Sequence, residues 1–387
     1  MIKVRNRLII LSILAFLTFF SCFVSGVEYA KAETLNENIN NQLEFIDLSK
    51  LETLSLELEQ GGLFNESFYK ILEGKYSFSY ESFYGYIKEI ILNSVFDFMP
   101  MLITILAISV FSALINNSKS HFNSDGVGSV INLISYLTII LLLSNKIYSY
   151  FTNAKIIIEN ISKVNEIMSP IILTLMIASG GTISASVYKP TVTFFTNGII
   201  NLILLVVFPL ITLVLTFGII SVFSKNIRFN KFVDFFSSVI KWIIGLTVTI
   251  FGLFLSIQGL SGAIHDGISI KAAKYAISNS VPIVGGFLRD TFDLTIAGSV
   301  LIKNAIGISS IIILINYILV PVLEIAIFSL TLKLTSAFAE SIAENKTSEL
   351  CGYVSKALSF LNAIILLAGF LLFITILLMI FSANAFI

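Results

Sequence analysis

The chain has 387 residues, of which 56% are hydrophobic and 12% are charged, and its mean hydropathy is +0.93. Soluble domains carry about 25% charged residues, so this chain has too few to coat a water-exposed globule of its size. Its 24 basic and 24 acidic residues cancel, which leaves no net charge to attract nucleic acid. The composition excludes a soluble protein and predicts an integral membrane protein.

Residue types that carry chemistry are scarce. The chain has two cysteines, Cys22 and Cys351, and two histidines, His121 and His265, which excludes a disulfide framework and argues against a zinc site. The phosphate-binding pattern G-x-x-x-x-G-K-[ST], the nucleophile pattern G-x-S-x-G and the zinc pattern H-E-x-x-H are absent. We therefore expect no enzyme activity, no cofactor and no metal site.

The N-terminus has the pattern of a secretory signal peptide over residues 1–32. A basic start precedes the apolar run 8–20, and Ala30-Lys31-Ala32 forms a cleavage site of the A-x-A kind. Cleavage there places the mature N-terminus outside the cytoplasm, whereas the alternative is an uncleaved first membrane helix. Cys22 raises a lipoprotein alternative, which Phe19 disfavours because it stands where a lipobox has leucine.

Residues 33–92 are predicted to form an extracytoplasmic helical segment. The stretch carries several acidic residues, leucines at partly helical spacing and an aromatic cluster from Phe64 to Tyr86. Two interpretations stay open. The segment is either a helical cap on its own membrane domain, or a surface for a partner or for the membrane interface, where aromatic rings are favoured.

Residues 93–387 are predicted to be a polytopic, all-α membrane domain. A bilayer core about 30 Å thick requires around 20 apolar residues per helix, and only helices or closed barrels satisfy the backbone in lipid. Two shorter candidates, Ile167–Val187 and Phe287–Ile302, are rich in small polar residues or interrupted by charge. With these the count is six to eight spans, and the six longer runs are Val95–Ile115, Val127–Ser144, Thr191–Phe223, Trp242–Ile264, Ala305–Leu334 and Leu358–Phe381.

The connection after Thr191–Phe223 sets the expected orientation. It is rich in basic residues, which accumulate on the cytoplasmic side of membrane proteins. With the N-terminus outside, the simplest topology makes Thr191–Phe223 one long span, which Pro209 can kink. In this topology the segment around Gly180-Gly181 is re-entrant or lies at the membrane interface. The basic residues are Lys225, Arg228, Lys231 and Lys241.

The prolines suggest an internal repeat. Pro170 and Pro282 are 112 positions apart, and so are Pro209 and Pro321. Each half contains a Pro-Ile step, a short glycine-containing segment and a long apolar run, and duplicated units of this sort build many transport folds. Because the chain has only six prolines, coincidence is the alternative.

Small residues recur at helical spacing along Trp242–Ile264. In lipid such rows let helix backbones approach closely, because van der Waals packing replaces the hydrophobic drive for association. We expect a tight helix–helix contact here, with either this chain or another as the partner. The helix-packing residues are Gly245, Thr249, Gly252, Ser256, Gly259 and Ala263.

Glu324 lies inside the apolar run Ala305–Leu334, three residues after Pro321. An ionisable group within a span is costly and indicates function by default. Lys333 can snorkel near the helix end, and it is not a simple partner because nine positions separate it from Glu324. Glu324 is therefore a candidate intramembrane polar site, with a structural hydrogen bond to a neighbouring helix as the alternative.

The stretch from His265 to Gly307 carries a series of short motifs. An Asp-Gly-Ile-Ser-Ile run precedes a lysine, Pro-Ile-Val-Gly and Lys-Asn-x-x-Gly, and the upstream stretch Ala178–Pro190 reads ASGGTISASVYKP. Neighbours on a helix do not face each other, so we expect His265 and Asp266 to form a helix-terminal turn with Gly267. From about residue 40 to 387, the chain resembles the stage III sporulation protein AE family. The motif residues are Asp266, Gly267, Lys274, Pro282, Gly285, Lys303, Asn304 and Gly307.

This resemblance implies a role in endospore formation by a Gram-positive bacterium. Members of the family sit in the mother-cell membrane around the engulfed forespore, as multi-pass subunits of a channel complex related to secretion systems. The implied partners are other membrane subunits of the stage III sporulation A assembly, including a separate ATPase, together with the lipid bilayer and an indirect forespore-side partner. The alternative function is a stand-alone secondary transporter or permease of a small solute, in which the repeats and Glu324 form the site.

Overall fold

The computed structural model describes residues 39, 42–43, 48–58, 60, 62–117, 125–223, 229–280, 285–342 and 344–382. The regular elements in these ranges are all helices, as predicted, and the expected leader at 1–32 lies outside them. Two short helices come first, α3 (Ser49–Glu57) and α4 (Leu63–Leu72). The long segments are α5 (Tyr80–Asn117), α6 (Asp125–Ala178), the run of α7 (Thr182–Thr193), η2 (Phe194–Ile200), η3 (Ile203–Val207) and α8 (Phe208–Phe223), and then α9 (Asn230–Ser280), α10 (Gly285–Ser341) and α11 (Asn345–Ser382).

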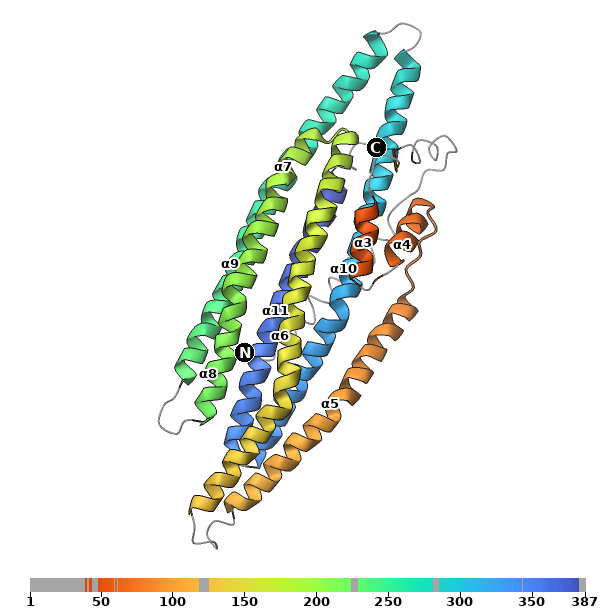
Figure 1. Ribbon diagram of the computed structural model, residues 1–387. Coiled ribbons are helices and arrows are strands. Elements are labelled where there is room, and N and C mark those ends of the chain that lie inside the picture. The colour runs from red at the N-terminus through yellow and green to blue at the C-terminus, as the bar shows by residue number, and fades with distance from the viewer. Residues whose placement is uncertain are drawn as a thin grey trace.

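The long helices form an elongated bundle in which successive segments run in opposite directions (Figure 1). The most enclosed helix is α11, whose most apolar stretch is 72% buried within the chain, compared with 17% for α9. Its neighbours are α10, α8, α6 and α9, and α10 also packs on α5 and α4. The core therefore sits around α10 and α11, whereas α9 is an outer helix.

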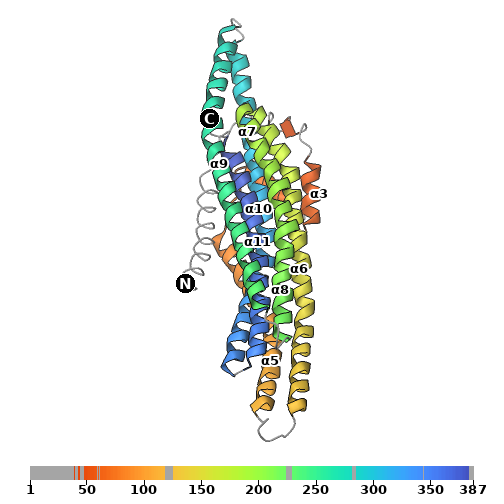
Figure 2. The same cartoon turned by 90° about the vertical axis from the view of Figure 1, so that its left-hand side faces the viewer.

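Several of the helices are much longer than a bilayer is thick, among them α6, α9 and α10. The 51 residues of α9 and the 57 residues of α10 correspond to roughly 75–85 Å at the α-helical rise, against about 30 Å for the hydrocarbon core. Both helices project together beyond the others at one end of the bundle (Figures 1 and 2). A single crossing uses less than half of each helix, and the rest is available for contacts outside the hydrocarbon.

Among the described residues, six helices are long and apolar enough to cross a membrane, which confirms the predicted polytopic all-α class. The two shorter candidates are not additional spans. Ile167–Val187 covers the end of α6, a turn at 179–181 and the start of α7, whereas Phe287–Ile302 lies within α10. Gly180-Gly181 therefore lies in a turn between two antiparallel helices.

The predicted long span before the basic connection is one continuous helical run, but its irregular part precedes Pro209. The segments η2 and η3 are π-helical, and such wide turns are rare and frequently occur at functional sites. Pro209 is the second residue of α8 and follows η3 directly. Since proline has no N–H to donate, we attribute the wider hydrogen-bonding pattern of η3 to this missing donor.

The 112-residue proline spacing does not bring equivalent helix ends into register. Adding 112 to the turn at 179–181 gives 291–293, and these positions lie inside α10. Pro170 and Pro321 lie inside α6 and α10, while Pro282 lies outside the described residues. Each half does contain an antiparallel helix pair, α6 with α7–α8 and α9 with α10, but their turns fall at different positions of the proposed repeat.

The helices α3 and α4 form a cap on the membrane domain, beside α10 (Figure 1). Phe64 and Phe68 stack on each other and are buried, and Phe64 faces α6 and α10 across a cavity of about 10 Å³. Glu57 of α3 pairs with Lys163 of α6 at 3.8 Å. These contacts favour the cap interpretation for α3 and α4. The following helix, α5, begins at Tyr80 and continues without a break past residue 92.

Candidate functional site

The first turn of α7 receives a carboxylate from a distant helix. Asp266 of α9 is fully buried, and its two oxygens accept hydrogen bonds from the backbone N–H groups of Ile183 and Ser184, each at 2.9 Å. The residue before α7 is Gly181, which has no side chain to cap the helix. A carboxylate at this position satisfies two amides that lack helical acceptors and interacts favourably with the helix dipole. Asp266 therefore fixes α7 against α9.

The predicted helix-terminal turn at His265, Asp266 and Gly267 is wrong, because α9 continues through these residues to Ser280. The carboxylate of Asp266 instead caps the start of a different helix, α7. A spacing of 83 residues separates Asp266 from Ile183, so no local sequence pattern discloses the pairing.

The turn before α7 also depends on close contact with α9. Gly180 has a φ of +87°, a left-handed conformation that favours glycine. A Cβ added there would lie 2.7 Å from Cγ1 of Ile270. The segments ASGGTIS and DGISI therefore meet each other, and we name their contact, made by Gly180, Ile183, Ser184, Asp266 and Ile270, the α7–α9 junction.

A second junction joins α10 to the end of α11. Lys303 is fully buried, and its Nζ donates a hydrogen bond to the carbonyl oxygen of Ile380 at 2.8 Å. Ile380 lies in the last turn of α11, where carbonyl groups lack helical N–H donors. An Nζ–H donor in this position satisfies one of these carbonyls. Lys303, Gly307 and Ile380 make up what we name the α10–α11 junction.

Gly307 lets the two helices approach at this junction. A Cβ on Gly307 would lie 2.4 Å from Cδ1 of Ile380, far inside van der Waals contact. Asn304 is buried beside it, and its Oδ1 has no hydrogen-bond donor among the described residues. The Lys-Asn-x-x-Gly pattern thus supplies both a helix cap and a close helix crossing.

The remaining motif residues lie where α9 and α10 leave the bundle. Lys274 pairs with Asp293 at 2.6 Å across the two helices, next to a small apolar cluster that includes Ile270. Gly267 is buried in α9 and Gly285 begins α10, whereas Pro282 lies outside the described residues. An ion pair and an apolar cluster therefore hold the projecting helices together.

The small residues of α9 face away from the described chain. Gly245, Thr249, Gly252 and Ser256 are exposed, and a Cβ added at Gly245 or Gly252 would meet no atom within 4 Å. The hydroxyls of Thr249 and Ser256 donate to the carbonyls of Gly245 and Gly252, so they leave this surface without unsatisfied donors. We name these four residues the α9 stripe. The surroundings of Gly259 and Ala263, which continue the helix, lie outside the described residues.

Glu324 lies half-buried on α10, near charged groups of two other helices. Lys146 of α6 and Asp97 of α5 act on it electrostatically. Lys146 is exposed, and its Nζ lies 5.7 Å from the ring centre of Phe98. The structure thus brings Glu324, Lys146 and Asp97 to one region of the bundle, although the sequence singled out Glu324 alone.

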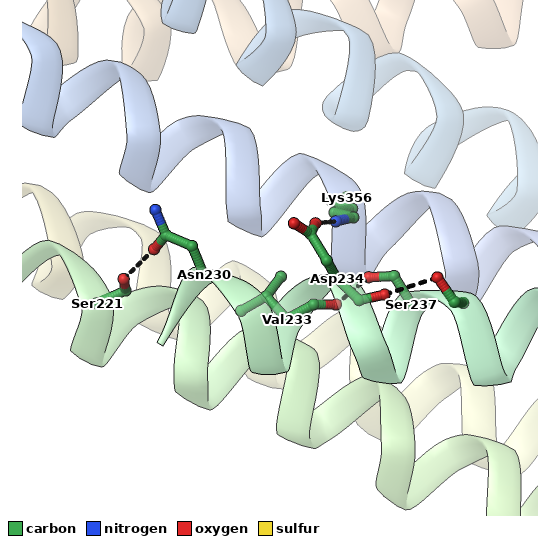
Figure 3. A network of polar contacts seen from close by, with 7 residues as sticks. Ser221, Asn230, Val233, Asp234, Ser237 and Lys356 are labelled. Atoms are coloured by element: carbon green, nitrogen blue, oxygen red, sulfur yellow. Dashed lines mark hydrogen bonds and ion pairs between the residues drawn. The ribbon is translucent and has the colours of Figure 1, made fainter. Parts of the chain in front are cut away.

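Sequence reasoning also missed a polar network between α8, α9 and α11 (Figure 3). Lys356 of α11 reaches Asp234 of α9 at 3.2 Å, and Ser221 of α8 bonds Asn230 at the start of α9. Beside it, Ser329 of α10 bonds Ser355 and Ser359 of α11, at 2.9 Å in each case. Interhelical hydrogen bonds of this kind contribute about 0.6 kcal/mol each in membranes. The only sequence signal was a pair of serines four residues apart in α11.

The arrangement as a whole supports helix association. Within the described ranges, no three His, Cys, Asp or Glu side chains gather where they could hold a metal ion. Cys351 is fully buried in α11. The charged motif residues Asp266, Lys274 and Lys303 all bond partners on other helices.

Comparison with known proteins gives a consistent match over most of the chain. A family model described as Stage III sporulation protein AE matches residues 64–383. The curated protein "Stage III sporulation protein AE" of Bacillus subtilis (strain 168) is 25% identical over 330 residues, which cover 84% of this chain and 83% of that protein. No solved structure matches the chain. The matched range contains α4 to α11 and therefore both junctions.

We predict that Asp266→Ala loosens α7. The substitution leaves the buried amides of Ile183 and Ser184 without an acceptor, which should lower the free energy of unfolding by roughly 2–3 kcal/mol. Thermal unfolding in detergent and hydrogen exchange at these two amides measure the effect. Asp266→Asn keeps one acceptor and should lose less stability than Asp266→Ala. Asp290→Ala, at an exposed site, should leave the free energy of unfolding unchanged. Unchanged exchange in α7 would refute the capping role.

We predict that Gly307→Ala destabilises the α10–α11 junction by roughly 1–3 kcal/mol, because the added methyl group overpacks the contact with Ile380. Adding Ile380→Ala removes both clashing carbons and should recover part of this loss as a favourable coupling energy. Gly245→Ala provides the matched control, since its methyl group meets no atom within 4 Å. The measurement is the thermal midpoint of each variant, and strictly additive effects would contradict the proposed contact.

Proposed function

The chain belongs to the stage III sporulation protein AE family, and from this we propose that it is a membrane core subunit of the stage III sporulation A assembly. Family membership implies a role in sporulation. In our proposal the assembly is a channel or secretion-like complex between mother cell and forespore, and this chain lies in the mother-cell membrane around the forespore. A separate ATPase subunit supplies the energy, and contact with the forespore side is indirect.

The observation that carries this proposal is the outward position of the α9 stripe. Small residues promote helix association in lipid only when another helix packs on them. In the described chain no side chain or backbone approaches Gly245 or Gly252. The sequence therefore provides a helix-packing surface that the described part of the fold leaves open, as expected for a subunit that binds another membrane protein.

The projecting part of α9 and α10 offers a second surface for a partner. Ile268 and Tyr275 are 62% and 72% exposed, and their spacing of seven places them on one side of α9. The ion pair of Lys274 with Asp293 stiffens this part of the helix pair. We propose that it reaches a partner subunit outside the hydrocarbon.

The proposed orientation follows from the sequence signals and the helix directions. The signal peptide at 1–32 places the cap on the extracytoplasmic side, and the basic connection between α8 and α9 belongs in the cytoplasm. Since α5 runs from the cap toward the end of the bundle opposite the projecting parts of α9 and α10 (Figure 1), the projecting helices are extracytoplasmic as well.

The α9 stripe gives the first test. Gly252→Leu should reduce recovery of companion subunits at least about tenfold when the tagged chain is purified from sporulating cells, because a bulky side chain separates the packed backbones. Gly85→Leu is the matched control, since Gly85 is also exposed with no atom within 4 Å of an added Cβ. An unchanged complex on a native gel would argue against the stripe as a docking surface.

A stand-alone transporter is the second candidate, and the grouping of Glu324 with Lys146 and Asp97 favours it. Transport coupled to protons predicts proton flux into vesicles that contain this chain alone, with loss of that flux in Glu324→Gln. Our proposal predicts that neither the unaltered chain nor Glu324→Gln gives a proton flux above that of protein-free vesicles. A pH-sensitive dye inside the vesicles distinguishes the two outcomes.

A further inference from the structure

An open groove lies on the outward face of the helical run that begins with α7. It is shallow and wide open to the outside, and it is lined by Ser186, Lys189, Pro190, Thr193, Phe194 and Gly198. All six residues come from α7 and η2, where the α-helical pattern changes to a π-helical one. We name this feature the Lys189 groove.

One end of the groove is polar and cationic. Lys189 is exposed, and no carboxylate of the described residues lies within ion-pair distance of it. The hydroxyls of Ser186 and Thr193 flank the lysine, and each donates its proton to a backbone carbonyl. Their lone pairs and the ammonium group of Lys189 remain at the surface. Pro190 lacks an N–H, so the usual α-helical hydrogen bond to the carbonyl of Ser186 is missing on this face.

The other end of the groove is apolar. Phe194 is 38% exposed and packs on Phe254 of α9, with the ring centres 5.6 Å apart. Gly198 lies beneath the Phe194 ring and adds no side chain of its own to the groove. The long apolar run of this span begins at Thr191, two residues after Lys189. The groove therefore changes from cationic to apolar at the depth where a span enters the membrane.

This gradient matches a phospholipid. A lysine at the start of a span lies at headgroup level, where it can bond a phosphate, and the apolar surface deeper along the helix suits an acyl chain. We propose that the Lys189 groove binds one anionic phospholipid, with its phosphate at Lys189 and an acyl chain along Phe194 and Gly198. The inference requires only that Thr182–Phe223 crosses the membrane, and it does not depend on the proposed assembly.

The test is a lipid titration of the purified full-length chain in detergent, followed by native mass spectrometry. Phosphatidylglycerol should bind in a first, tight step, and phosphatidylcholine should not. Lys189→Gln should weaken that step at least about tenfold, the effect of losing one charge-assisted contact, whereas Lys189→Arg should retain it. Lys271→Gln, at an exposed lysine of α9 beyond the span, should bind as the unaltered chain does.

A second variant checks the apolar half of the groove. Gly198→Leu fills the space beside Phe194 and should weaken phosphatidylglycerol binding while the positive charge stays in place, with thermal midpoints confirming that the variant folds. Three results would overturn the proposal: equal binding of phosphatidylcholine, full phosphatidylglycerol binding by Lys189→Gln, or displacement of the lipid by soluble inorganic phosphate alone. Full lipid binding by Gly198→Leu would equally refute the placement of the acyl chain.

Discussion

Two helix ends that lie inside this protein receive their hydrogen-bond partners from other helices. The first turn of α7 has no capping side chain of its own, and Asp266 supplies both missing acceptors. The last turn of α11 has carbonyl groups without donors, and Lys303 supplies one. A backbone group that is buried without a hydrogen-bond partner costs about 1–3 kcal/mol, so the two contacts depend on these two side chains being in place.

The same two places also bring helices into close contact. Gly180 meets Ile270 at the α7–α9 junction, and Gly307 meets Ile380 at the α10–α11 junction. A charge that caps a helix end holds the two backbones in one register, and the glycine nearby removes the side chain that would separate them. Polar capping and close packing therefore act together, which explains why charged residues and glycines occur side by side in the two motifs.

The outer surface of the bundle is different in kind. The α9 stripe and the Lys189 groove both lie on faces that the described chain leaves open, one formed by small side chains and the other by a lysine above an apolar depression. Inside the bundle, Gly307, Asp266 and Lys303 each contact another helix of the chain. On the outside, the same residue types are available to another membrane protein and to lipid, which is what a subunit of a membrane assembly needs.

The sequence by itself determined the membrane class, the all-α fold and the six long spans, because the thickness and polarity of a bilayer restrict length and composition directly. Through its family resemblance it also singled out Asp266, Lys303 and Gly307. It could not assign their roles, since Asp266 and Ile183 are 83 positions apart and Lys303 and Ile380 are 77 apart. Only the tertiary structure decided which helix end each charge caps and which face of α9 points outward, because these depend on how distant helices pack and not on any local period.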